Sequence, residues 1–221
     1  MQEQILILDF GSQFTQLIAR RLREMNVYCE IHPFNKIPAL TPNIKGVILS
    51  GSPHSVRQEN PLNPSLENIK GKLPLLGICY GAQLTTKQYG GKVEKSSSRE
   101  YGRAQLCNIS HNYALTDGIE EHNQVWMSHA DTILTLAPDA EVIAQTESIP
   151  VAAFSMKNTP NPLVCLQFHP EVTHSQNGKQ IIENFVVGMC GSTKNWTPAS
   201  YIEETIATIQ NKSETKKSSW R

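Results

Sequence analysis

The sequence predicts an α/β fold, namely an open, doubly wound, mostly parallel sheet with flanking helices, plus a smaller β-rich part. Short apolar runs within residues 4–89 alternate with segments of helical spacing, which is typical of doubly wound folds. Because these runs carry few polar residues, they suit strands that are buried on both faces of a parallel sheet. In residues 92–168 the segments are short and partly alternating, which indicates β-hairpins.

The elements of the first half follow from this alternation. The apolar run from Gln4 to Leu8 predicts the first strand. Ser12 is placed to cap the next helix, which is expected to run through Met25 with apolar residues at helical spacing. The remaining expected elements are strands at 27–31, 46–50 and 75–78 and helices at 66–70 and 80–89.

Strands dominate the second half, and helices return near its end. Helical spacing in residues 176–189 predicts a helix that packs back on the sheet. Thr197 and Pro198 mark the start of a last helix to about Gln210, because threonine caps helices and proline suits their first turn. The expected strands are 104–109, 124–127, 141–145, 151–154 and 163–168.

Charge and cysteine content narrow the classes of protein. Lys plus Arg and Asp plus Glu each number 20, so the formal net charge of zero favours neither a nucleic-acid nor a membrane partner. No apolar run approaches the roughly 20 residues that span a bilayer, and we expect no signal peptide. The five cysteines form no CxxC motif, which predicts a reducing, cytoplasmic setting.

Residues 77–81 read Gly-Ile-Cys-Tyr-Gly and come at the end of an apolar run. A nucleophile with a small residue two places away on either side is typical of a nucleophile elbow, a tight turn between a strand and a helix. Glycines suit the flanks because a Cβ would collide there. Cys79 is therefore the candidate nucleophile, and a buried structural cysteine is the alternative.

A cysteine nucleophile needs a base, and His169 has the most informative neighbourhood of the seven histidines. It closes an apolar run, so we expect it at a strand end, where open α/β sheets bind their ligands. Pro170 pushes His169 into an extended conformation, which points His169 and Glu171 to the same side. The sequence thus predicts a triad in which Glu171 orients His169 for Cys79, although a His-x-Glu pattern alone is more often found on the surface.

A tetrahedral intermediate would need backbone N–H donors for its oxyanion. In an elbow, one donor is the residue after the nucleophile, here Tyr80. The second candidate is Gly51, which follows a predicted strand, because glycine lets the backbone approach a ligand closely. An ordinary turn explains this second loop equally well.

The two motifs together resemble those of the class I (triad) glutamine amidotransferases, whose fold is flavodoxin-like. They are Gly-Ile-Cys-Tyr-Gly-Ala-Gln at 77–83 and Phe-His-Pro-Glu at 168–171. Within this class, five further motifs resemble those of the glutaminase domains of GMP synthetases, and the resemblance covers about residues 4–200. These motifs lie at residues 7–21, 99–103, 125–131, 169–174 and 196–198.

The resemblance implies a reaction and a role for each catalytic group. Cys79 would hydrolyse L-glutamine through a γ-glutamyl thioester and release ammonia for the amination of XMP to GMP. His169 would be the general base and acid, and Glu171 its orienter. Gly51 and Tyr80 would supply the oxyanion N–H groups. No metal and no cofactor are implied for this step.

The resemblance also implies three substrate contacts. Gln83, Ser128 and Asp131 match positions that contact the substrate, and Asp131 has the right charge for the ammonium group of glutamine. The alternatives are an exposed helix position for Gln83 and a turn residue for Asp131. Ser52 stands where relatives often have a second glycine, which matters little if the donor is a backbone N–H.

The phosphate-binding loop of the synthetase half, a Ser-Gly-Gly-Val-Asp type of motif, does not occur in this sequence. We therefore expect a glutaminase domain at 1–192 and, at 193–221, a linker helix and polar tail that lead to an ATP pyrophosphatase domain. ATP and Mg²⁺ would bind only to that domain. The ATP pyrophosphatase domain would belong either to the same full-length chain as the glutaminase domain, which we favour, or to a separate subunit. The full-length enzyme would be a homodimer.

Two other functions stay open at this point. One is a thiol hydrolase of related fold, such as a γ-glutamyl peptidase or a DJ-1/PfpI-like protein. Those proteins commonly place histidine directly after the cysteine, and Tyr80 argues against them. The other is a regulatory module with a degenerate glutaminase site, against which the presence of all three triad residues argues.

Overall fold

The protein is seen here as a computed structural model that describes residues 2–200, 202 and 206, without the side chains of 97–100. In chain order its elements are β1 (Gln4–Asp9), α1 (Thr15–Glu24), β2 (Cys29–Pro33), β3 (Ile44–Leu49), β4 (Leu75–Ile78), α2 (Tyr80–Gln88), β5 (Lys92–Cys107), η1 (Ala114–Thr116), β6 (Gln124–Thr135), β7 (Ala140–Thr146), β8 (Ala153–Met156), β9 (Leu163–Leu166), α3 (Gly178–Glu183) and the π-helix η2 (Asn184–Met189). The strands form a nine-stranded sheet in the order β2-β1-β3-β4-β9-β8-β7-β5-β6. The expected α/β fold is thereby confirmed. Among the described residues, no helix is both long and apolar enough to span a bilayer.

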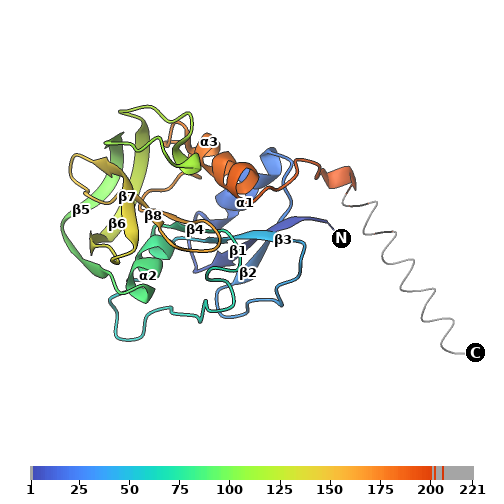
Figure 1. Ribbon diagram of the computed structural model, residues 1–221, viewed down its shortest axis with the longest axis horizontal. Helices are drawn as coiled ribbons and strands as arrows, with labels where there is room; N and C mark the ends of the chain where they lie inside the picture. The colour runs from blue at the N-terminus through green and yellow to red at the C-terminus, as the bar shows by residue number, and fades with distance from the viewer. Residues whose placement is uncertain (1, 201, 203–205, 207–221) are drawn as a thin grey trace, which may run out of the picture.

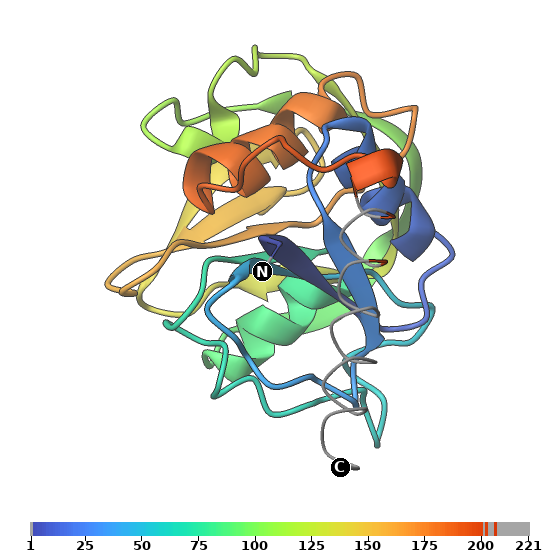
Figure 2. The same cartoon turned by 90° about the vertical axis from the view of Figure 1, so that its right-hand side faces the viewer.

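Five strands form the parallel half of this sheet. β1 pairs in parallel with β2 and β3, β3 pairs with β4, and β4 pairs with β9. Helices α1 and α3 lie on one face and α2 lies on the other (Figures 1 and 2). Successive residues of β1 therefore face different helices: Ile7 packs in the same cluster as Ile18 of α1, whereas Leu6 packs in the same cluster as Leu84 of α2. Burial on both faces explains why these strands are apolar throughout.

The predicted β-rich part continues the same sheet. β8 pairs antiparallel with β9, β7 with β8, and β5 with both β6 and β7. β5 and β6 are much longer than the expected strands at 104–109 and 124–127. Their added residues pair in a hairpin that carries many charged and polar side chains, so apolar patterning does not reveal it.

The expected helix at 66–70 is wrong. This segment makes a hydrogen-bonded turn in which Ile69 and Lys70 both donate to the carbonyl of Leu66. Gly71 follows with φ +68°, a left-handed conformation that ends helical geometry. Only one more turn follows, in which Lys72 and Leu73 donate to the carbonyl of Ile69, and two such turns are too short to persist as a helix. The crossovers from β2 to β3 and from β3 to β4 are thus loops.

Ser12 was also wrongly predicted as the cap of the first helix. Helix α1 begins at Thr15, and Phe14 is its N-cap residue, without a side-chain cap. Ser12 Oγ accepts a hydrogen bond from the N–H of Phe14 in the preceding turn. Thr15 Oγ1 donates to Asp9 Oδ1 at the end of β1, so the start of α1 is tied to the strand instead of to a capping serine.

The C-terminal helices agree in part with those expected from the sequence. The expected helix at 176–189 is α3 followed by the π-helix η2, which share this span. Residues 198–200 are helical, and Thr197 caps them, because its Oγ1 accepts the N–H of Ser200. The continuation of this helix to Gln210 and the polar tail lie outside the described residues, apart from two helical positions.

Candidate active site

The nucleophile elbow is formed by Cys79, between β4 and α2. Its backbone has φ 51° and ψ −100°, a conformation that costs energy for a residue with a Cβ. A Cβ on Gly77 would lie 2.8 Å from the carbonyl carbon and oxygen of Gly81, and one on Gly81 would lie 2.6 Å from the Cβ of Leu49. Both flanking residues must therefore be glycine in this geometry, as the sequence predicts.

The elbow is also fixed by main-chain hydrogen bonds to its neighbouring strands. The N–H of Cys79 donates to the carbonyl of Leu166 at 2.7 Å, at the end of β9. The N–H of Gly81 donates to the carbonyl of Ser50, just after β3, at 3.2 Å. Since β3 and β9 flank β4 in the sheet, the strain at Cys79 is held by the rigid centre of the fold.

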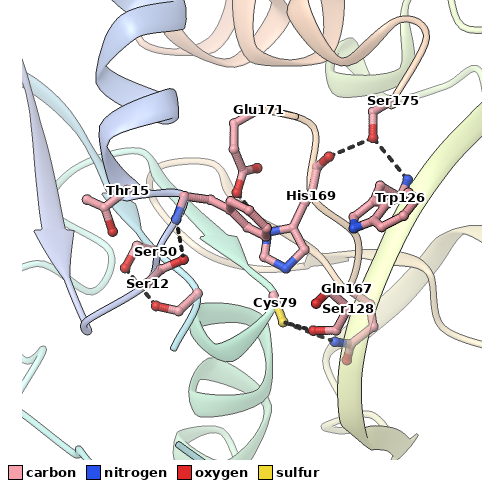
Figure 3. A network of polar contacts seen from close by, with 12 residues as sticks. Ser12, Thr15, Ser50, Cys79, Trp126, Ser128, Gln167, His169, Glu171 and Ser175 are labelled. Atoms are coloured by element: carbon pink, nitrogen blue, oxygen red, sulfur yellow. Dashed lines mark hydrogen bonds and ion pairs between the residues drawn. The ribbon is translucent and has the colours of Figure 1, made fainter. Parts of the chain in front are cut away.

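His169 and Glu171 lie on the segment that follows β9, and the structure brings both together with Cys79 (Figure 3). His169 Nδ1 is 2.7 Å from Glu171 Oε1, and both side chains are almost fully buried. The ring of Phe14 packs edge-on against the imidazole, with centroids 5.0 Å apart. The predicted contact between His169 and Glu171 is thus present, and it is shielded from water.

The buried carboxylate controls the charge of His169. Burial alone acts to lower the pKa of His169, but the charge of Glu171 and the neighbouring Cys79 outweigh it and raise this pKa to about 10. The second histidine of the cleft, His129, behaves in the opposite way, since burial lowers its pKa to about 4. Near neutral pH, His169 is therefore the protonated imidazole beside the thiol, and His129 is neutral.

Four hydrogen bonds that sequence reasoning missed hold the His169 segment in place. Ser175 Oγ donates to the carbonyl of His169 at 2.6 Å and accepts the N–H of Trp126 at 3.0 Å (Figure 3). The N–H of His169 donates to the carbonyl of Trp126 on β6. Arg21 of α1 donates from Nε to the carbonyl of Glu171. The bonds from Trp126 and Arg21 join segments that are far apart in the sequence, so no local pattern reveals them.

The two predicted oxyanion donors both lie at the thiol. A Cβ on Gly51 would be 3.1 Å from His169 Cε1 and 3.7 Å from Cys79 Cβ, so a side chain here would crowd the imidazole. Tyr80 is the first residue of α2, and first-turn N–H groups of a helix have no acceptor within the helix. The side chain of Ser50 supports this loop, because its Oγ accepts the N–H of Phe10.

Gln83, Ser128 and Asp131 line the same cleft as Cys79 and His169. Gln83 is buried, not exposed, and its Nε2 donates to the carbonyl of Asp131 at 2.9 Å. The carbonyl of Ser128 is 3.8 Å from Cys79 Sγ. Gln167, which sequence reasoning missed, places Nε2 3.9 Å from the same sulfur (Figure 3). Its signal was its position two residues before the histidine, on the same strand end.

The Asp131 carboxylate already has partners from the loop after β3. Ser55 Oγ donates to its Oδ2, and Arg57 Nη1 lies 3.2 Å from its Oδ1. Neither Ser55 nor Arg57 was predicted as a site residue. The loop that begins at Gly51 thus lies beside Cys79 and His169 at one end and contacts this carboxylate at the other.

A cleft of about 440 Å³ joins these groups, with Cys79, His169, Gln83, Ser128 and Asp131 on its walls. A larger, mostly apolar cleft of about 1130 Å³ lies between residues 34–44 and 61–73, and none of the predicted site residues lines it. The predicted nucleophile, its histidine and the predicted substrate contacts thus all line the smaller cleft. The described residues hold no group of three or more His, Cys, Asp or Glu placed to bind a metal ion.

Comparison with known proteins places this site in a family. The family model described as glutamine amidotransferase class-I matches residues 6–189. A GMP synthase (glutamine-hydrolyzing) from Cytophaga hutchinsonii is 53% identical over 217 residues, which is 98% of this chain and 42% of that protein. One from Phocaeicola vulgatus is 51% identical over 95% of this chain and 40% of that protein. The chain therefore spans about two fifths of the length of these relatives.

Solved structures agree with this placement. A protein from Thermoplasma acidophilum described as one subunit of a GMP synthase has a TM-score of 0.71 at 29% identity, over 93% of this chain and 98% of that one. A glutamine amidotransferase from Thermotoga maritima has a TM-score of 0.69 at 19% identity, over 87% of this chain and 100% of that one, and it shares the fold. The elbow, the buried histidine–carboxylate pair and the family match lead to one conclusion: this chain belongs to the class-I glutamine amidotransferase family.

Proposed function

We propose that this chain hydrolyses L-glutamine to glutamate and ammonia through a thioester on Cys79. The observation that supports it most is the strained cysteine beside a buried histidine whose partner is a buried carboxylate. This arrangement supplies a nucleophile and a proton carrier, as acyl transfer from an amide requires.

The first half-reaction forms the thioester. The thiolate of Cys79, paired with the His169 imidazolium, attacks the side-chain carbonyl of glutamine, and a sulfur–carbon bond forms. The carbonyl oxygen becomes an oxyanion that accepts hydrogen bonds from the backbone N–H groups of Gly51 and Tyr80. The intermediate then collapses and breaks its carbon–nitrogen bond. His169 gives its proton to the leaving nitrogen, and ammonia departs.

The second half-reaction restores the enzyme. Neutral His169 takes a proton from water, which attacks the thioester carbon. The carbon–sulfur bond breaks, glutamate leaves, and Cys79 returns to the thiolate–imidazolium pair. Glu171 stabilises the imidazolium in both halves, since the proximity of its carboxylate is what raises the pKa of His169. In this proposal Gln83, Ser128 and Asp131 hold the substrate, and Asp131 receives its ammonium group.

The proposed reaction uses protein groups throughout, so we propose that it needs neither a metal nor a cofactor. Treatment with a strong chelator should leave ammonia release from glutamine unchanged. A loss of activity that added Mg²⁺ restores would contradict this part of the proposal.

For the whole protein we propose the role that the relatives' names describe, the synthesis of GMP with glutamine as nitrogen source. Residues 1–192 would be the glutaminase domain, and residues 193–221 would lead to an ATP pyrophosphatase domain that binds ATP and Mg²⁺ and aminates XMP. That domain is the proposed protein partner, within a homodimeric, cytoplasmic enzyme. No nucleic-acid or membrane partner is proposed.

The test is ammonia release from glutamine by the wild-type chain, by Cys79→Ala and by Cys107→Ala. Cys107 is a half-buried cysteine outside the cleft and serves as the matched control. We expect Cys79→Ala to lose at least about 10³-fold in rate, since the covalent route is gone, and Cys107→Ala to keep the wild-type rate. Equal rates for wild type and Cys79→Ala would reject the assigned nucleophile. Lasting failure of the wild type, even with its synthetase partner, would favour a regulatory module.

A further inference from the structure

The Asp131 carboxylate sits in a pair of contacts that glutamine would have to change. Arg57 Nη1 is 3.2 Å from Asp131 Oδ1, and Ser55 Oγ donates to Oδ2. The Asp131 side chain is 8% exposed and the Arg57 side chain is 38% exposed, so the pair lies at the mouth of the cleft with the carboxylate on the inner side. The backbone N–H of Arg57 also donates to Ser55 Oγ, which orders the segment that carries the guanidinium.

The position of this pair matches the far end of a bound glutamine. The reacting carboxamide must lie at Cys79, and the cleft extends from there along β6 to Asp131. Gln83 spans the floor between them, because it lies one helical turn after Cys79 and donates to the Asp131 carbonyl. The amino-acid end of glutamine, which carries one ammonium and one carboxylate, would therefore meet Asp131 and its surroundings.

An ammonium at Asp131 leaves the substrate carboxylate in need of a cation. Among the cleft-lining residues that the structure describes, none is lysine or arginine. His129 is neutral there, since burial lowers its pKa to about 4. His169 lies at the thiol end, where it serves the reaction. Arg57 is the guanidinium that the structure places in contact with the cleft carboxylate.

Resting on the glutaminase function proposed above, we propose that Arg57 binds the α-carboxylate of glutamine while Asp131 binds the α-ammonium. In the substrate-free protein the two side chains neutralise each other. On binding, each exchanges its partner for the opposite charge of the substrate, so no charge is left buried without a counter-charge. A guanidinium suits this role because it offers several N–H donors to a planar carboxylate.

The proposal predicts that the site binds free glutamine more tightly than amides that lack its α-ammonium or α-carboxylate. A short amide without the amino-acid end leaves the Arg57–Asp131 pair intact, so its affinity gains nothing from these two side chains. An analogue whose α-carboxylate is converted to an amide keeps the contact with Asp131 but loses that with Arg57. Replacing Arg57 should therefore weaken the binding of the acid but not that of the α-amide.

The experiment uses 6-diazo-5-oxo-L-norleucine, a glutamine analogue that alkylates the catalytic thiol, and its α-carboxamide. The half-saturating concentration for labelling Cys79 is measured by mass spectrometry. For the free acid we expect Arg57→Met to raise this concentration by about tenfold or more, as for the loss of a charge-assisted hydrogen bond. Arg57→Lys should recover part of the loss. For the α-amide, the half-saturating concentration should be no higher in Arg57→Met than in the wild type, because this analogue displaces Arg57 from Asp131 and gains nothing from it.

Two controls separate binding from damage to the fold. Arg20→Met removes a guanidinium that is 73% exposed and paired with Glu24, away from the cleft, and it should label as the wild type does. Iodoacetamide is too small to use the amino-acid end, so it should alkylate Cys79 at the same rate in wild type and Arg57→Met.

Three results would overturn the proposal. One is an unchanged half-saturating concentration for the free acid in Arg57→Met. Another is a lowered one, which would make the ion pair a barrier to binding instead of a binding site. The third is a higher half-saturating concentration for the free acid, but not for the α-amide, in Arg99→Met and no such change in Arg57→Met. The structure does not describe the side chain of Arg99. Failure of the proposed glutaminase function looks different: iodoacetamide would label wild-type Cys79 and the glutamine analogue would not.

Discussion

The two halves of the sheet serve the site in different ways. The parallel half holds Cys79 by backbone geometry, with glycines that have no room for a Cβ and main-chain hydrogen bonds to both neighbouring strands. The antiparallel half contributes Ser128 and Asp131 from β6, and Asp131 is held by side chains of the loop after β3. Under the proposed function, the chemistry would take place at the centre of the sheet, and the substrate would be recognised at its antiparallel half by side chains that can exchange partners.

If this division is right, the largest effect comes from the triad carboxylate. Glu171→Gln removes the largest of the contacts that raise the pKa of His169, so this pKa falls and less imidazolium is present near neutral pH. We expect ammonia release from glutamine to fall by about 10²- to 10⁴-fold. Alkylation of Cys79 by iodoacetamide near neutral pH should slow as well.

The matched control is Glu183→Gln, which removes a carboxylate that forms an ion pair with Lys194 outside the cleft. It should leave both rates unchanged. Wild-type alkylation rates in Glu171→Gln would show that the carboxylate does not act on the thiol through His169, and the assignment of chemistry to the parallel half would be lost.

Next in size is the elbow itself. In Gly81→Ala the new Cβ would lie 2.6 Å from Leu49 Cβ and 2.7 Å from the Leu49 carbonyl oxygen, so the turn must shift. We expect the free energy of unfolding to fall by about 3 kcal/mol, as for an overpacked core. Urea denaturation measures this loss.

Gly188→Ala is the control, because a Cβ there meets nothing within 4 Å. Its free energy of unfolding should stay within about 1 kcal/mol of the wild type, with a gain favoured by the better helix propensity of alanine. Equal stability of the two variants would mean that the elbow is not the rigid feature described.

The histidine–carboxylate pair should also make stability depend on pH. The pKa of His169 rises from an ordinary 6.5 to about 10 on folding. Its contribution to stability is then complete below pH 6.5 and is lost as the pH rises toward 10. The difference in free energy of unfolding between wild type and His169→Gln should shrink by a few kcal/mol between about pH 6 and about pH 10. A difference that stays constant across this range would show that His169 is neutral in the folded protein.

The smallest effect belongs to the antiparallel half. Asp131→Asn keeps the shape of the side chain but removes the charge that would hold the substrate ammonium. We expect about a tenfold rise in the glutamine concentration for half-maximal rate, with an unchanged rate of alkylation by iodoacetamide. Asp139→Asn, at an exposed turn, is the control. An altered alkylation rate in Asp131→Asn would mean that the two halves do not divide recognition from chemistry.

The same contrast explains what the sequence could predict. The elbow and the positions of the parallel strands along the chain follow from local patterns, because strands buried on both faces are apolar throughout and a tight turn demands glycine. The contact between His169 and Glu171 also follows locally, from extended geometry at a proline. The bounds of β4 and the start of α2 agree with the expected residues.

The rest depends on contacts between distant segments. Arg57 meets Asp131 from 74 positions away, and Gln167 meets Cys79 from 88 positions away, so no motif contains either pair. The full lengths of β5 and β6 are set by pairing with each other, not by apolar alternation. The helix expected at 66–70 was wrong for a local reason. Its apolar spacing indicated a helix, but Gly71, in a left-handed conformation, ends the turn.

The measurement that tests the central claim most directly is rapid acid quenching of the protein during glutamine turnover, followed by peptide mapping. We predict a glutamyl group bound to the peptide that contains Cys79. No adduct should form in Cys79→Ala. Turnover of glutamine with the glutamyl group on another residue, or with no covalent adduct under conditions that trap thioesters, would contradict the account.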